Sequence, residues 1–149
     1  MDQVSGPSDG DGPTPALLLR LGDENLAVPL GDVREVVVSP VVSSLPTAPA
    51  ALLGLFSVRG EIVPLYDPAS LIGFGSTPDP SYAVVIDLDG APAALAFGSV
   101  PELVELGEQI ADAESEGTLG VRRAGAVHAV VVDVAALFTS VGVTGRALR

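Results

Sequence analysis

Residues 52–67 read Leu-Leu-Gly-Leu-Phe-Ser-Val-Arg-Gly-Glu-Ile-Val-Pro-Leu-Tyr-Asp, and this stretch is the most informative part of the chain. Its two apolar runs, Leu55–Val58 and Ile62–Tyr66, are typical of β-strands, and the dipeptide Arg59-Gly60 between them predicts a tight hairpin turn. Arg59 is the only basic residue in positions 35–121, which also hold 12 carboxylates. A single cation at a turn suits recognition of one group better than attraction to an extended charged surface.

Short apolar runs of the same kind recur from Ala16 onward, and turn-forming residues separate them. The segments Gly22–Asn25, Asp89-Gly90 and Arg122–Gly125 are typical of turns. Many short strands at this spacing predict an all-β barrel or sandwich without long helices. The predicted strands are Ala16–Leu21, Leu26–Leu30, Val33–Val38, Leu55–Val58, Ile62–Tyr66, Tyr82–Leu88, Ala93–Phe97, Leu119–Val121 and Ala126–Val134.

Three short helical turns are also expected. Pro49–Leu53 precedes a glycine, a residue type that often follows the end of a helix. Asp67-Pro68 is typical of an N-cap followed by the first helical position, with Gly73 as the end of that turn. Val134–Phe138 contains two alanines and is expected to leave the last strand as a helical turn.

Length and composition predict one folded domain with a polar end. The chain has 149 residues, enough to bury one substantial core. Eleven of the first fifteen residues are Gly, Pro, Ser or Asp, so residues 1–15 cannot bury enough apolar surface to offset their ordering entropy and are expected to be a disordered tail. Residues 16–140 are expected to form the folded domain, and residues 141–149 a C-terminal extension.

Several locations are disfavoured by the sequence. Hydrophobic residues make up 48% of the chain, yet no apolar run approaches the roughly 18–20 residues that span a bilayer. The N-terminus lacks the basic and apolar regions of a secretory signal. The chain has no cysteine, which excludes disulfides and thiolate metal sites. We therefore expect a cytoplasmic protein.

The charge balance argues against two kinds of partner. The net charge is −12, from 19 acidic residues and seven arginines. Such a chain repels phosphate backbones and anionic lipid, so neither nucleic-acid binding nor direct membrane insertion is expected. Pro101–Glu116 holds six acids and no base. Because these acids lack the tight alternate spacing of a calcium-binding loop, we expect a solvated loop rather than a cation site.

No enzyme class fits the residues. Nucleophilic catalysis by serine needs a histidine base, and the one histidine, His128, lies inside the predicted strand Ala126–Val134, where a structural hydrogen bond is its expected role. His128 and Asp133 are too few to hold a metal ion. Gly73-Phe74-Gly75 is not the glycine-rich start of a helix after a strand, so it is no dinucleotide loop. We expect no catalytic residue, cofactor or metal site.

The opening stretch also carries a family pattern. Gly54-x-x-Ser57-Val58-Arg59-Gly60-x-Ile62-Val63-Pro64-Leu65-x-Asp67 resembles the signature of the CheW-like family of chemosensory coupling proteins, Gly-x-x-Asn-Leu-Arg-Gly-x-Ile-Val-Pro-Val-x-Asp-Leu. The resemblance extends over nearly the whole chain from Ala16. Leu17–Leu30 is similar to the family's first hairpin, Val33–Val36 to its Val-x-Glu-Val/Ile element, and Asp133-x-x-x-Leu137 to its closing Asp-x-x-x-Leu.

Three positions depart from the family pattern. Ser57-Val58 stands in place of Asn-Leu, which is conservative in size and strand tendency. Pro68 replaces the leucine after the aspartate. Phe97-Gly98 occupies the position of a family Val-Asp pair. If that aspartate positions a partner loop, a different partner or weaker binding follows.

The resemblance implies both a fold and a role. The fold is all-β, with two small five-stranded SH3-like β-barrels that share a hydrophobic seam, and a few short helices. The role is that of a non-enzymatic adaptor, which couples the cytoplasmic tips of chemoreceptors to the regulatory domain of a CheA-type histidine kinase in a signalling array. The residues that match partner-contacting positions of the family are Arg59, Gly60, Val33, Glu35, Val36, and Val84 or Val85.

Two alternatives remain open from the residues alone. Arg59 can pair with a neighbouring carboxylate and pin the hairpin, and this role is compatible with partner recognition because an arginine fork can bridge two acids. The alternative function is a small β-barrel regulatory or ligand-binding module outside chemotaxis.

Overall fold

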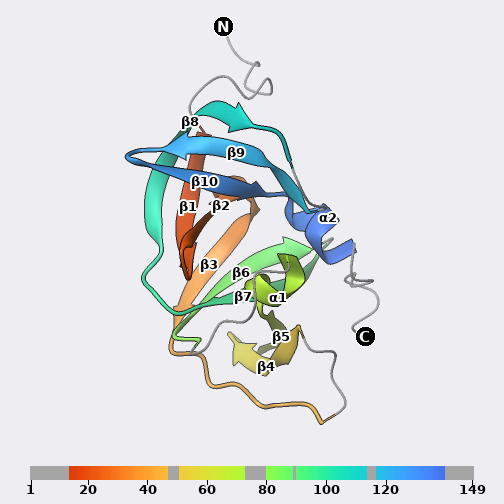
Figure 1. The fold of residues 1–149 in the computed structure, drawn as a ribbon. Helices are drawn as coiled ribbons and strands as arrows, with labels where there is room; N and C mark the ends of the chain where they lie inside the picture. The colour runs from red at the N-terminus through yellow and green to blue at the C-terminus, as the bar shows by residue number, and fades with distance from the viewer. Residues whose placement is uncertain (1–13, 47–50, 73–79, 89, 114–116, 140–149) are drawn as a thin grey trace, which may run out of the picture.

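A computed structural model of the chain describes residues 14–46, 51–72, 80–88, 90–113 and 117–139 (Figure 1). These residues form ten strands, two short α-helices and one 3-10 turn. The elements are β1 (Thr14–Leu21), β2 (Glu24–Pro29), η3 (Leu30–Asp32), β3 (Val33–Val38), β4 (Leu52–Val58), β5 (Glu61–Tyr66), α1 (Pro68–Ile72), β6 (Tyr82–Leu88), β7 (Ala91–Phe97), β8 (Glu102–Ala111), β9 (Thr118–Ala124), β10 (Val127–Val132) and α2 (Val134–Thr139).

The first and last parts of the described chain build one closed barrel. Its strand order is β1-β2-β10-β9-β8, and β8 pairs back onto β1. β10 runs parallel to β2, and the other neighbours are antiparallel. Closure of the ring removes the free strand edges that an open sheet would present.

The middle of the chain forms a second five-stranded sheet, in the order β3-β6-β7-β5-β4. Its edge strands are therefore β3 and β4. The segment after β3 returns to β4, where the Ser43 N–H donates to the Leu55 carbonyl oxygen at 2.8 Å and the Leu55 N–H donates to the Ser43 carbonyl oxygen at 2.9 Å. This backbone bridge draws the two edges of the second sheet together.

Gly54 makes that close approach possible. Its φ is 153°, and a Cβ atom at this position would collide with the Ser43 carbonyl oxygen and lie 2.7 Å from Val42 Cγ1. The first glycine of the signature is thus required by the path of the segment that crosses β4.

Buried apolar residues form three clusters. The largest, which we call the interbarrel core, joins β1 and β2 of the barrel to β6 and β7 of the second sheet, and includes the fully buried Phe97 and Phe138. Smaller clusters fill the first barrel and the inner face of the second sheet. The rings of Tyr66 and Phe138 meet edge-on with centroids 5.1 Å apart, so α2 is fixed against β5 at the junction.

The expectation of an all-β fold with a few short helices is confirmed. Of the two five-stranded barrels that were expected, one is a closed barrel and the other is a five-stranded sheet whose edge strands are β3 and β4. All nine predicted strands occur within three residues of their predicted ends. The solvated loop expected within Pro101–Glu116 is wrong, because residues 102–111 form β8. β8 is a strand because it is hydrogen-bonded to β1 on one side and β9 on the other as the barrel closes. Only Leu106 of β8 is buried, so its sequence lacks the regular alternation of apolar and polar residues that predicts a strand.

The turn predicted at Arg122–Gly125 is also misplaced, since β9 continues through Ala124. Arg122 is buried, with an exposed fraction of 9%. Its Nε donates to the Gly107 carbonyl oxygen at 2.7 Å and its Nη2 to the Leu106 carbonyl oxygen at 3.3 Å. These acceptors lie where the β8–β9 register shifts, so Arg122 satisfies carbonyls that a regular ladder would pair.

Two of the three predicted helical turns are confirmed, as α1 and α2. Asp67 is buried and caps α1, because its Oδ1 accepts from the Ala69 N–H at 3.1 Å and its Oδ2 from the Ser70 hydroxyl at 3.2 Å. The turn predicted over Pro49–Leu53 is wrong, since Leu52 and Leu53 begin β4; residues 47–50 and 73 lie outside the described residues.

The predicted boundary of the N-terminal tail is two residues too long. Thr14 and Pro15 already pair with Leu106 and Glu105 of β8. Residues 1–13 and 140–149 lie outside the described residues, so the tail, the C-terminal extension and the exact limits of the domain remain predictions.

We expect Gly54→Ala to destabilise the fold by at least about 2 kcal/mol, since an alanine would combine an unfavourable φ with overlap against the Ser43 backbone. Chemical denaturation measures this loss. Gly31→Ala is the matched control, because a Cβ at Gly31 meets no atom within 4 Å. Equal stability of the two variants would contradict the packing role of Gly54.

A second prediction concerns Asp32, whose pKa is raised above its usual value of 3.8 by burial and by the negative charge of Asp133. The fold thus disfavours the ionised form, and the stability from protonated Asp32 is lost as the pH rises through the folded-state pKa. Because Asp32 is only partly buried, solvent screens the effect. Asp32→Asn should raise Tm by about 1–3 °C at pH 7, and this gain should shrink towards about pH 3. A pH-independent difference in thermal melts would contradict it.

Candidate functional site

The β4–β5 hairpin turn has an unusual backbone. Val58 pairs with Glu61, so Arg59 and Gly60 alone make the turn. Their φ angles are 51° and 85°, and positive φ at both central residues is the geometry of a type I′ turn. Glycine adopts it freely, whereas a left-handed conformation costs other L-residues about 1–2 kcal/mol. Arginine at the first position is therefore explained by its side chain and not by the turn.

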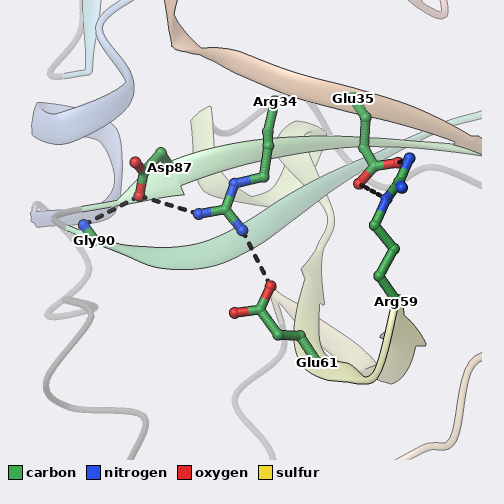
Figure 2. Close-up of polar contacts among 6 residues, drawn as sticks. All are labelled: Arg34, Glu35, Arg59, Glu61, Asp87 and Gly90. Carbon is green, nitrogen blue, oxygen red and sulfur yellow. Dashed lines mark hydrogen bonds and ion pairs between the residues drawn. The ribbon is translucent and has the colours of Figure 1, made fainter.

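The Arg59 side chain lies against Glu35 of β3 (Figure 2). Its Nε donates to Glu35 Oε2 at 3.2 Å and its Nη2 to Glu35 Oε1 at 3.3 Å. These hydrogen bonds, together with the carboxylate charge, raise the pKa of Arg59. The Arg59 side chain is nonetheless 79% exposed, against 24% for Glu35. The pairing with a neighbouring carboxylate is thus present, and it leaves most of the guanidinium open to solvent.

A second set of ion pairs lies beside the first. Arg34 Nη1 donates to Glu61 Oε1 at 3.2 Å, and Arg34 Nη2 lies 3.6 Å from Asp87 Oδ1 (Figure 2). Asp87 Oδ1 also accepts from the Gly90 N–H at 3.0 Å. Sequence reasoning did not single out these residues. The sequence signal that could have indicated these ion pairs is the charge order, because a positive residue precedes a negative one both on β3 and on the hairpin.

The predicted site valines differ in exposure: Val36 is exposed, Val33 is half-buried, and Val84 and Val85 are buried. Val33 and Val36 lie opposite Ile86 and Val84 of β6, two members of the interbarrel core, and Val36 is 38% exposed at the rim of that core. Val84 and Val85 are 0% and 1% exposed. They cannot touch a partner directly in this conformation and can act only by supporting β3.

An apolar groove of about 550 Å³ lies along the gap between β3 and β4. In sequence, one set of lining residues follows Glu35 and ends at Ser43, and the other begins at Leu55 and ends before Arg59. The groove is thus bounded by the Glu35–Arg59 ion pair and the Ser43–Leu55 backbone bridge, and Ile62 of β5 completes its lining. Val41 and Ile62 at its sides are 86% and 63% exposed. The lining residues are Val37, Ser39, Pro40, Val41, Ser43, Leu55, Phe56, Ser57 and Ile62.

The structure also places His128 and the acidic side chains that the sequence offered as candidates for chemistry. His128 lies exposed on β10. Within the described ranges, no group of three or more histidine, aspartate or glutamate side chains could hold a metal ion. None of the described helices is long and apolar enough to cross a membrane.

Comparison with known proteins places this geometry in a family. The family model described as "CheW-like domain" matches residues 15–142. A probable chemotaxis protein CheW from Rhizobium etli is 32% identical over 57 residues, which are 38% of this chain and 37% of that protein. The crystal structure of scaffolding protein TtCheW from Thermoanaerobacter tengcongensis matches with a TM-score of 0.74 at 20% identity, over 85% of this chain and 88% of that one. This structural likeness concerns the fold, while the family model spans most of the sequence: the chain belongs to the CheW-like domain family.

Proposed function

We propose that the protein is a non-enzymatic adaptor that couples chemoreceptors to a CheA-type histidine kinase in a chemosensory signalling array. The observation that carries this proposal is Arg59. It matches the arginine of the family signature that the sequence resembles, it adopts a backbone conformation that disfavours arginine, and its side chain is 79% exposed. Strain retained at an exposed residue is a common mark of a binding function.

An adaptor needs two separate surfaces, and the described residues offer two. One is the Arg59 turn with Glu35, which presents a guanidinium fork suited to a carboxylate or a carbonyl. The other is the rim of the interbarrel core at Val36, where an apolar side chain is 38% exposed. An apolar helix tip of a receptor fits such a rim, in the manner of a helix bound in a groove.

The departure at Phe97-Gly98 limits what the partner can contact. Phe97 is fully buried in the interbarrel core, and Gly98 has no side chain to offer. If relatives use a carboxylate there, this chain binds its partner without it. We therefore propose a kinase or receptor that differs at the matching position, or a weaker complex.

We further propose that the adaptor acts in the cytoplasm, since its partners present cytoplasmic surfaces. A net charge of −12 supports partners other than nucleic acid or anionic lipid. The apolar groove between β3 and β4 is the observation that favours the alternative, a small ligand-binding module. Two of its lining residues are more than 60% exposed, which leaves a small ligand poorly enclosed.

The test compares variants of Arg59 in binding to the regulatory domain of the kinase and to a receptor fragment. Arg59→Glu should weaken ternary assembly tenfold or more, because it removes the fork and adds a charge that repels Glu35. Arg59→Lys should recover binding only in part, since an ammonium keeps the charge and loses the two-donor geometry. Titration calorimetry measures the affinities.

Arg59→Asn separates recognition from folding. Asparagine tolerates positive φ, and Asn-Gly is the preferred pair for this turn. Its Tm should therefore equal or exceed that of the parent while affinity falls. Unchanged affinity in a well-folded Arg59→Glu protein would rule out the recognition role. Binding of a small metabolite without any kinase binding would favour the ligand module.

A further inference from the structure

We propose that Arg34 is a positioning residue, whose ion pairs with Glu61 and Asp87 hold the Arg59 turn against β3 in a single register. This inference rests on the proposed function, because it assigns Arg34 a part in presenting Arg59 to a partner. The argument starts from the topology of the second sheet, in which β3 and β4 are the two edges.

Two ion pairs, Arg34–Glu61 and Arg59–Glu35, cross from β3 at one edge of that sheet to the hairpin at the other. Arg34 and Glu61 are 27 residues apart in sequence, and Glu35 and Arg59 are 24 apart. Among the described residues, the backbone contact between these edges is the Ser43–Leu55 bridge. The turn end of the hairpin therefore depends on side chains for its position against β3.

The order of the charges defines that position. β3 carries a cation followed by an anion, Arg34 then Glu35, and the hairpin carries Arg59 followed by Glu61. The pairs are crossed, so that each cation meets the anion of the other segment (Figure 2). A shift that set Arg34 opposite Arg59 would oppose like charges, which is unfavourable. The two pairs together thus favour one register over its neighbours.

A β-bulge in β3 sets the direction of the Arg34 side chain. The ladder between β3 and β6 shifts register between Val33 and Glu35, and Arg34 has no partner in it. Such bulges redirect a side chain. Asp87 then holds the guanidinium from the β6 side, and the Gly90 N–H orients Asp87 in turn.

Exposure separates the roles of the two arginines. The Arg34 side chain is 35% exposed and has acidic partners on two different strands. The Arg59 side chain is 79% exposed and, among the described residues, pairs with Glu35. Arg34 is therefore suited to hold the hairpin, and Arg59 to meet a partner.

The first measurement follows the position of the hairpin directly. Because the chain has no cysteine, Val38→Cys and Ile62→Cys place two nitroxide labels on β3 and β5, at positions 66% and 63% exposed and outside the ion pairs. Adding Arg34→Glu should broaden the distance distribution between the labels. Restoring an opposite-charge pair between positions 34 and 61 with Glu61→Arg, in an Asp87→Asn background that avoids a new carboxylate pair, should narrow it again, because the attraction between β3 and the hairpin returns even though each segment then carries charges of one sign. General destabilisation would not be rescued by charge reversal.

The second measurement is affinity for the regulatory domain of the kinase, without labels. Arg34→Glu should weaken binding at least fivefold, and the charge-reversed protein should recover most of it. Arg123→Gln is the control, since it removes an exposed arginine that pairs with Glu108 at 3.8 Å in the first barrel; its affinity should match the parent.

Two results would overturn the inference. One is an Arg34→Glu protein whose label distribution matches the parent, and the other is a broadened distribution with unchanged kinase affinity. If the parent protein itself fails to bind the kinase domain, the proposed function is wrong, and the label measurement alone decides whether Arg34 sets the register.

Discussion

The position of the Arg59 turn beside β3 depends on the approach of the two edge strands of the second sheet. β3 and β4 lie at opposite ends of the strand order, and the backbone bridge from Ser43 to Leu55 brings the segment after β3 onto β4. Gly54 is the condition for that bridge, since any Cβ there would meet the Ser43 carbonyl oxygen. Gly54 and Arg59 of the signature therefore contribute to the same arrangement. Gly54 leaves room for the segment that crosses β4, and Arg59 projects from the hairpin turn that this crossing helps to position.

The interbarrel core gives this arrangement a rigid base. The second sheet is inserted between the two parts of the chain that form the first barrel, and both share the buried cluster around Phe97 and Phe138. Close packing of this kind resists small displacements. One face of β3 is therefore fixed by packing at Val33, while the other bears Glu35. If Arg59 binds a partner as proposed, its pairing with Glu35 on such a strand reduces the conformational entropy that binding costs.

Local pattern predicted most of the fold, and long-range contact decided what it missed. β3 and β6 have their predicted bounds because their apolar residues are dense. β8 was missed because closure of the barrel, and not its own composition, makes it a strand. The Arg59 turn was predicted from adjacent residues, whereas its partner Glu35 and the pairs of Arg34 depend on a strand order that no local pattern contains. The burial of Val84 likewise follows from packing between the barrel and the second sheet, and that of Val85 from the cluster on the inner face of the second sheet.

The net negative charge of the chain affects how an acidic partner would approach Arg59. A net charge of −12 repels acidic partners at long range, yet the exposed guanidinium of Arg59 attracts a carboxylate at short range. At physiological salt the distant repulsion is screened beyond about 8 Å. The remaining repulsion therefore acts only near contact. If a partner meets Arg59 with a carboxylate, as proposed, basic groups beside that carboxylate would offset the repulsion from neighbouring acids of this chain, whereas a uniformly acidic surface would bind more weakly.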